Sequence, residues 1–383
     1  MMTAALREFR QQAATIVVRG AMSLPLLAGP MPSAVIAQKL ARFWARAPFN
    51  RKRLDRAVDH LSEAFPDWAL ERRRDLACRA YEHLFQLGVE LAFAPRLLNE
   101  DGWLNHVDAS QAGPGLRAVL GSGPAVMVTG HCGNWEVLGY TMALLGFRMH
   151  ALYRPLDLEP LDRWVRATRS RRGLELVDKF GATDRLPSIL AAGEPVAFVA
   201  DQNAGDKGLF VPFFGRLAST YKSIGLVAIG ARVPVVVGCA TRITGSALPA
   251  DKVSPDEFLY DDADLPGYRY RMSIQDVIHP HEWESQPDPL FYLTARYRRA
   301  LEKAIRAAPE QYLWMHRIWK SRPRHEVLNR PFPKALEEKL RALPWLSDAD
   351  VEAIKDRSAR DARERAVSSA DARPEPETPA TAG

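Results

Sequence analysis

The chain has 383 residues, enough for one large domain or two smaller ones, and 47% of them are hydrophobic, which suffices for a sizeable core. Its net charge is +6, carried mostly by arginine. Such a surface suits phosphates, acidic proteins, anionic lipids or nucleic acid, and composition does not choose among them. The three cysteines, Cys78, Cys132 and Cys239, form no CxxC pair. This argues against a structural zinc site or a disulfide framework and favours a reducing compartment.

A moderately apolar stretch, residues 13–40, lies near the N-terminus and is interrupted by Arg19, Pro25, Pro30 and Pro32. It lacks the roughly 18 uninterrupted apolar residues of a spanning helix. An arginine inside the apolar core also fits a cleaved signal peptide poorly. Two interpretations stay open: a packed pair of amphipathic helices, or a helix that lies in a membrane interface.

The interfacial interpretation assigns two sets of side chains. The apolar set at the boundary between lipid and water would be Leu24, Leu26, Leu27, Phe43 and Trp44. A basic set follows it: Arg42, Arg46, Arg51, Lys52, Arg53 and Arg56. The basic set favours the membrane, because it would face anionic head groups.

Three regions are predicted along the chain. Residues 1–100 have helical periodicity and form the predicted membrane-associating region. Residues 101–348 form the predicted catalytic region. Residues 349–383 are charged and then rich in Ala, Pro, Glu and Thr, which predicts a disordered tail outside the fold.

In the middle region, short apolar segments alternate with helical patterns. The predicted strands are 125–129, 149–153, 174–177, 196–200 and 233–240, and the helices between them are 135–145, 161–172, 183–192 and 220–231. Gly146, Gly173 and Gly193 stand where helix C-caps belong. A further strand at 268–274 is compatible with an antiparallel edge, and a basic helix covers 288–307. The predicted fold class is α/β, with a mainly parallel sheet flanked by helices.

The segment Gly130-His131-Cys132-Gly133-Asn134-Trp135-Glu136 joins a predicted strand to a predicted helix, where α/β folds usually carry catalytic groups. Within one helix, His131 and Glu136 would point about 140° apart. They can meet only if His131 lies in the loop and folds back over the helix start, which Gly130 and Gly133 permit. Glu136 would then orient the imidazole while His131 Nε2 takes a proton from a hydroxyl. The alternative is a capping histidine beside a solvent-facing glutamate.

Two further groups in this segment bear on the chemistry. The backbone N–H groups of Gly133 and Asn134, at the helix start, are predicted to stabilise an oxyanion. Cys132 offers a competing mechanism, as a thiolate nucleophile with His131 as its base. Adjacent residues rarely point at one another, so a small buried cysteine is the favoured interpretation.

More blocks follow the segment in order. They are Tyr153-Arg154-Pro155, Arg169-Ser170-Arg171-Arg172-Gly173, Asp201-Gln202, Phe210-Val211-Pro212-Phe213-Phe214-Gly215, Gln311-Tyr312-Leu313-Trp314-Met315-His316-Arg317 and Trp319-Lys320-Ser321-Arg322-Pro323. With the His-x4-Glu signature, they resemble the late acyltransferases of lipid A synthesis, the lauroyl/myristoyl transferase family of the glycerolipid acyltransferase superfamily. The resemblance covers roughly residues 121–324.

The resemblance implies an acyltransferase attached to the cytoplasmic face of the inner membrane. It implies transfer of a fatty acyl chain from acyl carrier protein, or less often coenzyme A, to a hydroxyl of lipid A precursor or a related glycolipid. It maps the general base to His131 and its acidic partner to Glu136. We expect direct transfer with neither metal nor other cofactor, because a thioester donor is already activated. The family arginine maps best to Arg169, with Arg154 and Arg172 as neighbours. A guanidinium there can clamp a phosphate of the acceptor or the donor.

Further binding residues are predicted around this centre. Asp201 and Gln202 are predicted to bond sugar hydroxyls of the acceptor or to hold the active-site loop, although a turn-capping aspartate is a competing interpretation of Asp201. Asn134 is predicted to bind substrate. An acyl pocket is predicted at Phe213, Phe214 and Trp135, with core packing as the default for the two phenylalanines. His316, with Trp314 and Arg317 beside it, is a candidate cover for the pocket.

Three rival functions follow from the same residues. A lysophospholipid or other glycolipid acyltransferase on this fold would carry the same blocks. A non-enzymatic membrane-binding scaffold would use the basic faces, but the His131–Glu136 pair argues against it. Nucleic-acid binding fits the positive charge, but no recognised nucleic-acid motif supports it.

Overall fold

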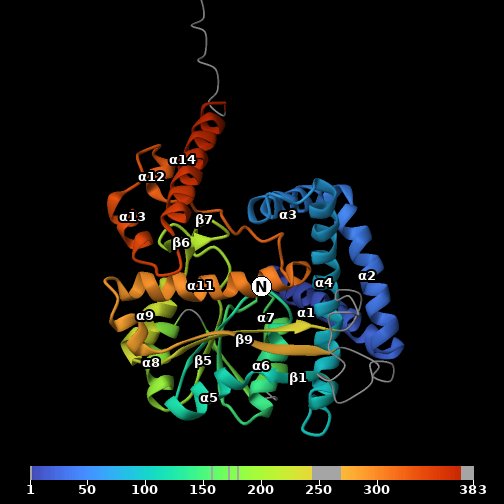
Figure 1. Ribbon diagram of the computed structural model, residues 1–383. Coiled ribbons are helices and arrows are strands. Elements are labelled where there is room, and N and C mark those ends of the chain that lie inside the picture. The colour runs from blue at the N-terminus through green and yellow to red at the C-terminus, as the bar shows by residue number, and fades with distance from the viewer. Residues whose placement is uncertain (1, 157, 171–172, 179–180, 244–268, 372–383) are drawn as a thin grey trace, which may run out of the picture.

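The computed structural model describes residues 2–156, 158–170, 173–178, 181–243 and 269–371. Its centre is a seven-stranded sheet in the order β1-β9-β8-β2-β5-β3-β4 (Figure 1). The strands are β1 (Val107–Gln111), β2 (Val126–Thr129), β3 (Met149–Tyr153), β4 (Leu174–Asp178), β5 (Val196–Val199), β8 (Val235–Arg242) and β9 (Tyr270–Ile278). Strands β8, β2, β5, β3 and β4 run parallel. The predicted α/β fold with a mainly parallel sheet is confirmed.

In the central sheet one strand differs in position from its prediction and one was missed; the two strands of a separate hairpin, β6 (Leu209–Phe213) and β7 (Arg216–Thr220), were missed as well. β9 is antiparallel to β8, as expected, but it lies inside the sheet because β1 pairs with its other side. The edge position was therefore wrong. β1 has the sequence Val-Asp-Ala-Ser-Gln, which carries too little apolar signal to be recognised.

Side chains of the central strands point alternately to two cores, one on each face of the sheet. Val126 and Val128 of β2 pack with α8 (Ala182–Ala191), α9 (Lys222–Ala231) and α11 (Pro289–Ala307). Met127 packs on the other face with α5 (Gly113–Ser122) and α6 (Trp135–Leu144). Helix α7 (Glu159–Ser170) connects β3 to β4, and α10 (Pro280–Glu284) precedes α11. Burial on both faces makes the strands continuous apolar runs, which is why the sequence located them.

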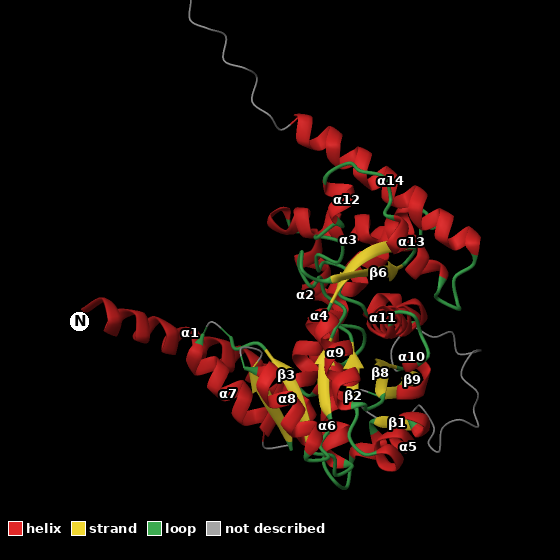
Figure 2. Ribbon diagram, turned by 90° about the vertical axis from the view of Figure 1, so that its left-hand side faces the viewer, coloured by secondary structure: helices red, strands yellow, loops and turns green. Residues whose placement is uncertain are grey.

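The N-terminal region is helical, as predicted. It comprises α1 (Met2–Ala28), α2 (Pro30–Arg46), α3 (Arg51–Ala64) and α4 (Leu70–Leu97), and α1 projects from the body (Figure 2). Among the described residues, no helix is long and apolar enough to cross a membrane. Large apolar side chains of α1 and α2 are nevertheless exposed: Phe9, Ile16, Val17, Leu24, Leu27, Val35, Ile36, Leu40, Phe43 and Trp44.

The C-terminal region forms a layer above α11, across from the sheet (Figures 1 and 2). It combines the hairpin of β6 (Leu209–Phe213) and β7 (Arg216–Thr220) with α12 (Arg324–Val327), α13 (Lys334–Arg341) and α14 (Asp348–Asp371). The prediction of a disordered tail is wrong for 349–371, which form most of α14. Val351 and Ile354 are buried there, and Asp361 pairs with Arg216 and Arg322. Residues 372–383 lie outside the described residues.

Candidate active site

The parallel pairing of β2 and β5 brings His131 and Asp201 together. Thr129 and Val199 are register partners at the carboxyl ends of these strands, and each functional residue follows two positions later. His131 Nδ1 lies 2.8 Å from Asp201 Oδ1. A Cβ atom at Gly130 would lie 3.3 Å from the Asp201 Cβ, so the glycine allows this close approach. The site therefore contains a histidine–aspartate pair at the carboxyl edge of the sheet.

Asp201 is built to remain ionised. Its side chain is 1% exposed, and burial alone would raise its pKa. The charge and hydrogen bond of His131, together with the charge of Arg298, outweigh burial and hold the pKa of Asp201 well below its usual range. Arg298 is itself fully buried and donates from Nη1 to the Ala200 carbonyl, 3.1 Å away.

An ionised Asp201 fixes the tautomer of the imidazole. The carboxylate accepts the Nδ1–H of His131, which leaves Nε2 with a lone pair. The His131 side chain is 19% exposed and lines a cavity, so substrate can reach it. This is the arrangement of a general base with a buried orienting carboxylate.

Glu136, the partner predicted for His131, has a different role in the structure. Its two carboxylate oxygens accept from Nε and Nη2 of Arg169 in α7, with a distance of 3.0 Å from Nε. The predicted His131–Glu136 pairing is therefore wrong. Arg169, predicted to clamp a phosphate, uses two of its donors on Glu136, and the two side chains are 18% and 13% exposed. This two-pronged ion pair ties α6 to α7 beside the cavity.

The backbone of the loop before α6 is bonded on both sides. Gly133 N–H donates to the Gln311 carbonyl at 2.9 Å, and Asn134 N–H donates to the Ala240 carbonyl at 2.7 Å. Gly133 has φ +68°, and a Cβ there would lie 2.2 Å from Ala240 O, so glycine is required. The two amides predicted to stabilise an oxyanion are thus already engaged.

The Asn134 side chain, predicted to bind substrate, makes structural contacts on both its amide atoms. Its Oδ1 accepts from Glu136 N and Val137 N, both at 3.1 Å, which caps α6. Its Nδ2 donates to Glu90 Oε2 at 2.7 Å, and Glu90 is also paired with Arg242 of β8. Glu90 and Arg242 were missed by sequence analysis, because isolated charges on α4 and β8 carry no motif.

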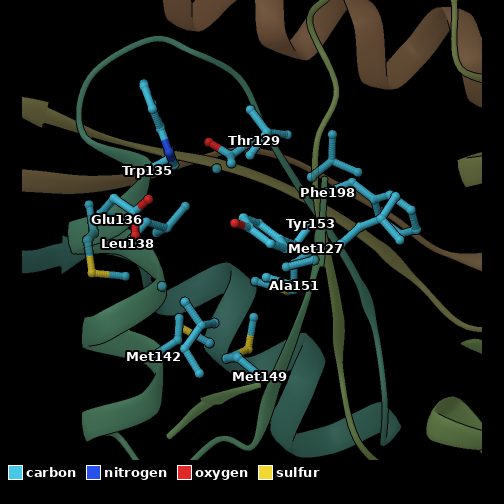
Figure 3. Close-up of a pocket in the computed structure, with 18 of the residues that line it drawn as sticks. Met127, Thr129, Trp135, Glu136, Leu138, Met142, Met149, Ala151, Tyr153 and Phe198 are labelled. Atoms are coloured by element: carbon cyan, nitrogen blue, oxygen red, sulfur yellow. The ribbon is translucent and has the colours of Figure 1, made fainter. Parts of the chain in front are cut away.

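An apolar cavity of about 350 Å³ begins at His131 and runs between the sheet and α6. This volume lies in the range of about 300–1,000 Å³ usual for small-molecule sites. Trp135 and Thr129 lie toward one end, and Met142 and Met149 toward the other (Figure 3). Other apolar lining residues are Leu116, Met127, Leu138, Ala151, Leu174, Leu176, Phe198, Met272 and Ile274. The cavity therefore has a polar mouth and an interior suited to an alkyl chain.

Of the three residues predicted to form an acyl pocket, one lines this cavity and two do not. Trp135 lines the cavity. Phe213 and Phe214 are buried in a separate core with Trp314 and Trp319, so they fill space there instead. Aromatic spacing in a sequence does not distinguish a channel wall from a core.

The mouth of the cavity is polar. Arg154 lines it and is exposed, and Tyr153 beside it donates its hydroxyl to Asp162. Arg172, also predicted here, lies outside the described residues. Of the arginines predicted to bind phosphate, Arg169 is paired with Glu136, whereas Arg154 is exposed and lines the cavity.

Gln202 and His316 complete the mouth. Gln202 Nε2 lies 2.5 Å from His316 Nδ1 and 3.5 Å from His131 Nε2. The rings of His131 and His316 have centroids 5.0 Å apart. Burial, and next the charge of His131, lower the pKa of His316 to about 4, so it is neutral at physiological pH. Sequence analysis gave His316 only a covering role.

Cys132 is not placed to act as a nucleophile. It is buried on the far side of the loop, where its Sγ lies 3.8 Å from Ala304 O and 3.9 Å from Ala308 O of the α11 end. Burial raises the pKa of this thiol well above its usual value. The prediction of a small buried cysteine is confirmed. Within the described ranges, no three His, Cys, Asp or Glu side chains gather to hold a metal ion.

Comparison with known proteins shows what this chain is similar to. Residues 5–321 match the family model described as bacterial lipid A biosynthesis acyltransferase. A lipid A biosynthesis palmitoleoyltransferase of Escherichia coli (strain K12) is 28% identical over 280 residues, covering 72% of this chain and 81% of that protein. A lipid A biosynthesis lauroyltransferase of the same strain is 27% identical over 177 residues, covering 45% of this chain and 48% of that protein.

Proposed function

Because this chain belongs to the bacterial lipid A biosynthesis acyltransferase family, we propose that it transfers a fatty acyl chain from a thioester donor to a hydroxyl of a lipid A precursor. The observation that carries the proposal is the His131–Asp201 pair at the polar mouth of an apolar cavity. A base that activates a hydroxyl and a slot that holds an alkyl chain are the two parts that acyl transfer to an alcohol needs.

The chemical steps follow from the tautomer. His131 Nε2 takes the proton of the acceptor hydroxyl as its oxygen bonds to the thioester carbonyl carbon. Asp201 stabilises the resulting imidazolium through Nδ1–H. When the tetrahedral intermediate collapses, the C–S bond breaks and the thiolate takes the proton from His131. The thioester is already activated, so this route uses side chains alone.

The cavity is proposed to hold the acyl chain. Each methylene that leaves water for the apolar interior contributes about 0.8 kcal/mol. The carbonyl carbon would then lie at the mouth beside His131, with the chain end toward Met142 and Met149 (Figure 3). The depth of the cavity would set the preferred chain length.

We propose acyl carrier protein as the donor, with acyl coenzyme A as the second candidate. Both present the thioester on a phosphopantetheine arm, so either brings a phosphate toward the mouth. Exposed Arg154 is the proposed contact for a donor or acceptor phosphate. Arg169 is proposed to position α6 through Glu136.

Attachment to the cytoplasmic face of the inner membrane is proposed to occur through α1 and α2. Their exposed apolar side chains, including Leu24, Leu27 and Phe43, suit a helix pair lying in the interface. The acceptor lipid would then reach the mouth from the membrane surface. Leu24→Glu combined with Leu27→Glu should release the protein from anionic vesicles in a flotation assay, and unchanged flotation would contradict this role.

The function is tested with purified protein, labelled acyl-acyl carrier protein or acyl coenzyme A, and a lipid A precursor. Wild type should form acylated lipid, and His131→Ala should lower kcat by about 10²–10⁴-fold. His281→Ala, an exposed histidine on α10, is the matched control and should retain full activity.

Two results would contradict the proposal. An acyl group trapped on Cys132 would exclude direct transfer. Acylation of lysophospholipid, with no acylation of the lipid A precursor, would show that the protein is a lysophospholipid acyltransferase instead. Lipid analysis of a deletion strain tests the identity of the acceptor in the cell. Unchanged acylation of lipid A in that strain would exclude the proposed acceptor.

A further inference from the structure

The source of oxyanion stabilisation is open once the loop amides are accounted for. A tetrahedral intermediate beside His131 requires a hydrogen-bond donor near its developing negative charge. The amides of Gly133 and Asn134 donate to backbone carbonyls. The amides of Glu136 and Val137 donate to the side chain of Asn134. With these four amides engaged, the remaining candidates are the Trp135 amide and a side chain at the cavity mouth.

Gln202 lies where such a donor is needed. It follows Asp201 directly, lines the cavity and is half-buried. Its carboxamide nitrogen lies between two imidazoles, 2.5 Å from His316 Nδ1 and 3.5 Å from His131 Nε2. The carboxamide thus stands beside the atom that takes the proton of the acceptor hydroxyl.

The proton positions around Gln202 are mutually consistent. His131 donates Nδ1–H to Asp201, so its Nε2 carries a lone pair. His316 is neutral, so its Nδ1 can accept from Gln202. One Gln202 hydrogen is held by His316, and the other points toward His131 Nε2. Because 3.5 Å is long for a hydrogen bond, that second hydrogen is available to a closer acceptor.

We propose that Gln202 is the oxyanion donor of the acyl-transfer reaction and that His316 is the positioning residue that holds its carboxamide; this rests on the function proposed above. As the acceptor oxygen bonds to the carbonyl carbon, the carbonyl π electrons move to oxygen, and the free Gln202 N–H donates to that oxyanion. Protonation of His131 Nε2 in the same step removes the lone pair that otherwise faces this hydrogen. Collapse returns the electrons to the carbonyl and expels the thiolate, which takes the proton from His131.

The first test removes the donor. Gln202→Met keeps the size of the side chain but cannot donate, and Gln202→Glu is a second variant of nearly the same shape. Both should lower kcat by about 10²–10³-fold while KM for the donor and acceptor stays near the wild-type value. The matched control is Gln275→Met on β9, which makes the same change away from the cavity and should retain activity.

The second test asks whether His316 acts through Gln202. His316→Phe should lower kcat by about tenfold or more, since it releases the carboxamide. The double variant Gln202→Met/His316→Phe should be no slower than Gln202→Met alone, because the two residues act as one unit. A histidine that only fills space would give losses that multiply, and that result would overturn its positioning role.

The outcomes separate this inference from the function it rests on. If the wild type transfers no acyl group to any lipid acceptor, the proposed function fails. If the wild type is active and folded Gln202→Met and Gln202→Glu keep kcat within about threefold, only this inference fails. The oxyanion would then be stabilised elsewhere, with the Trp135 amide in the first turn of α6 as the next candidate.

Discussion

His131 and Glu136 lie five residues apart on one short segment, yet the fold gives each a different hydrogen-bond partner. His131 lies at the end of β2 and meets Asp201, 70 residues further along the chain. Glu136 lies in the first turn of α6 and meets Arg169 of α7, 33 residues further along. The first pair faces the cavity mouth, and the second joins two helices beside it. The His-x4-Glu spacing therefore indicates where the site lies in the fold, but not which side chains pair with one another.

The largest expected difference between the two pairs is in catalysis. Asp201→Asn replaces the carboxylate that fixes the His131 tautomer with an uncharged amide that can also donate, and it should lower kcat by about 10²–10⁴-fold. Glu136→Gln leaves the His131–Asp201 pair intact and should cost less than about tenfold. Steady-state transfer from a labelled thioester measures both. A larger loss in Glu136→Gln than in Asp201→Asn would reverse the comparison.

The second prediction concerns the contribution of the Glu136–Arg169 pair to the free energy of unfolding. Glu136 and Arg169 are both mostly but not fully buried, so weakening their ion pair with Glu136→Gln should lower the free energy of unfolding by about 1–3 kcal/mol. The double variant Glu136→Gln/Arg169→Met should lose less than the sum of the single losses, because no buried charge is left unpaired. Urea unfolding measures this cycle. Strictly additive losses would mean that the pair does not join α6 to α7.

Most strands of the central sheet and the segment that carries His131 could be predicted from the sequence, but the side-chain pairings could not. The strands were visible because both faces of the sheet are buried, so β2, β5 and the first half of β8 are almost entirely apolar. Asp201 could be placed at the end of β5, but its contact with His131 depends on β5 lying next to β2, which periodicity does not specify. The cavity depends in the same way on how α6 packs against the sheet.

The misassigned tail has a related cause. Residues 349–371 are highly charged, which is typical of a solvated segment. The few apolar positions of α14, including Val351 and Ile354, recur on one face and enter the core. Asp361 is neutralised by arginines from β7 and from the segment before α12. The charges that indicated disorder are therefore in part the contacts that attach the helix.

The third prediction concerns His60 of α3, which has no acidic partner among the described residues, unlike His131 with Asp201. His60 Nδ1 is bound to the Trp314 carbonyl at 2.9 Å, and burial, aided by nearby Arg216, lowers the pKa of His60 to about 4. The unfolded state, with a histidine pKa near 6.5, binds more protons between about pH 4 and 6.5. Stability should be fully present above about pH 6.5 and fall as the pH drops toward 4.

Urea unfolding across that pH range checks the sign and the residue. His60→Gln should flatten the decline by roughly 1–3 kcal/mol, and His281→Ala, on the surface, should leave it unchanged. A decline that is the same in His60→Gln and wild type would show that His60 is not the group that titrates.

The smallest effect expected is on chain-length preference. Met142→Trp fills the end of the cavity away from the mouth (Figure 3) and should shift the preferred acyl chain to a shorter one, by about 0.8 kcal/mol for each methylene excluded. Leu145→Trp, three residues on and outside the lining, is the control. A series of acyl thioesters of increasing length measures the preference, and an unchanged profile in Met142→Trp would mean that the chain binds elsewhere.

The pairing of His131 with Asp201 is tested most directly by the ring-nitrogen spectrum of ¹⁵N-labelled histidine in the intact protein. At pH 8, the wild type and Glu136→Gln should both show His131 with Nδ1 protonated and Nε2 unprotonated. Asp201→Asn should change that pattern, while the spectra of distant histidines stay the same. A His131 signal that changes with Glu136→Gln and persists in Asp201→Asn would contradict the account.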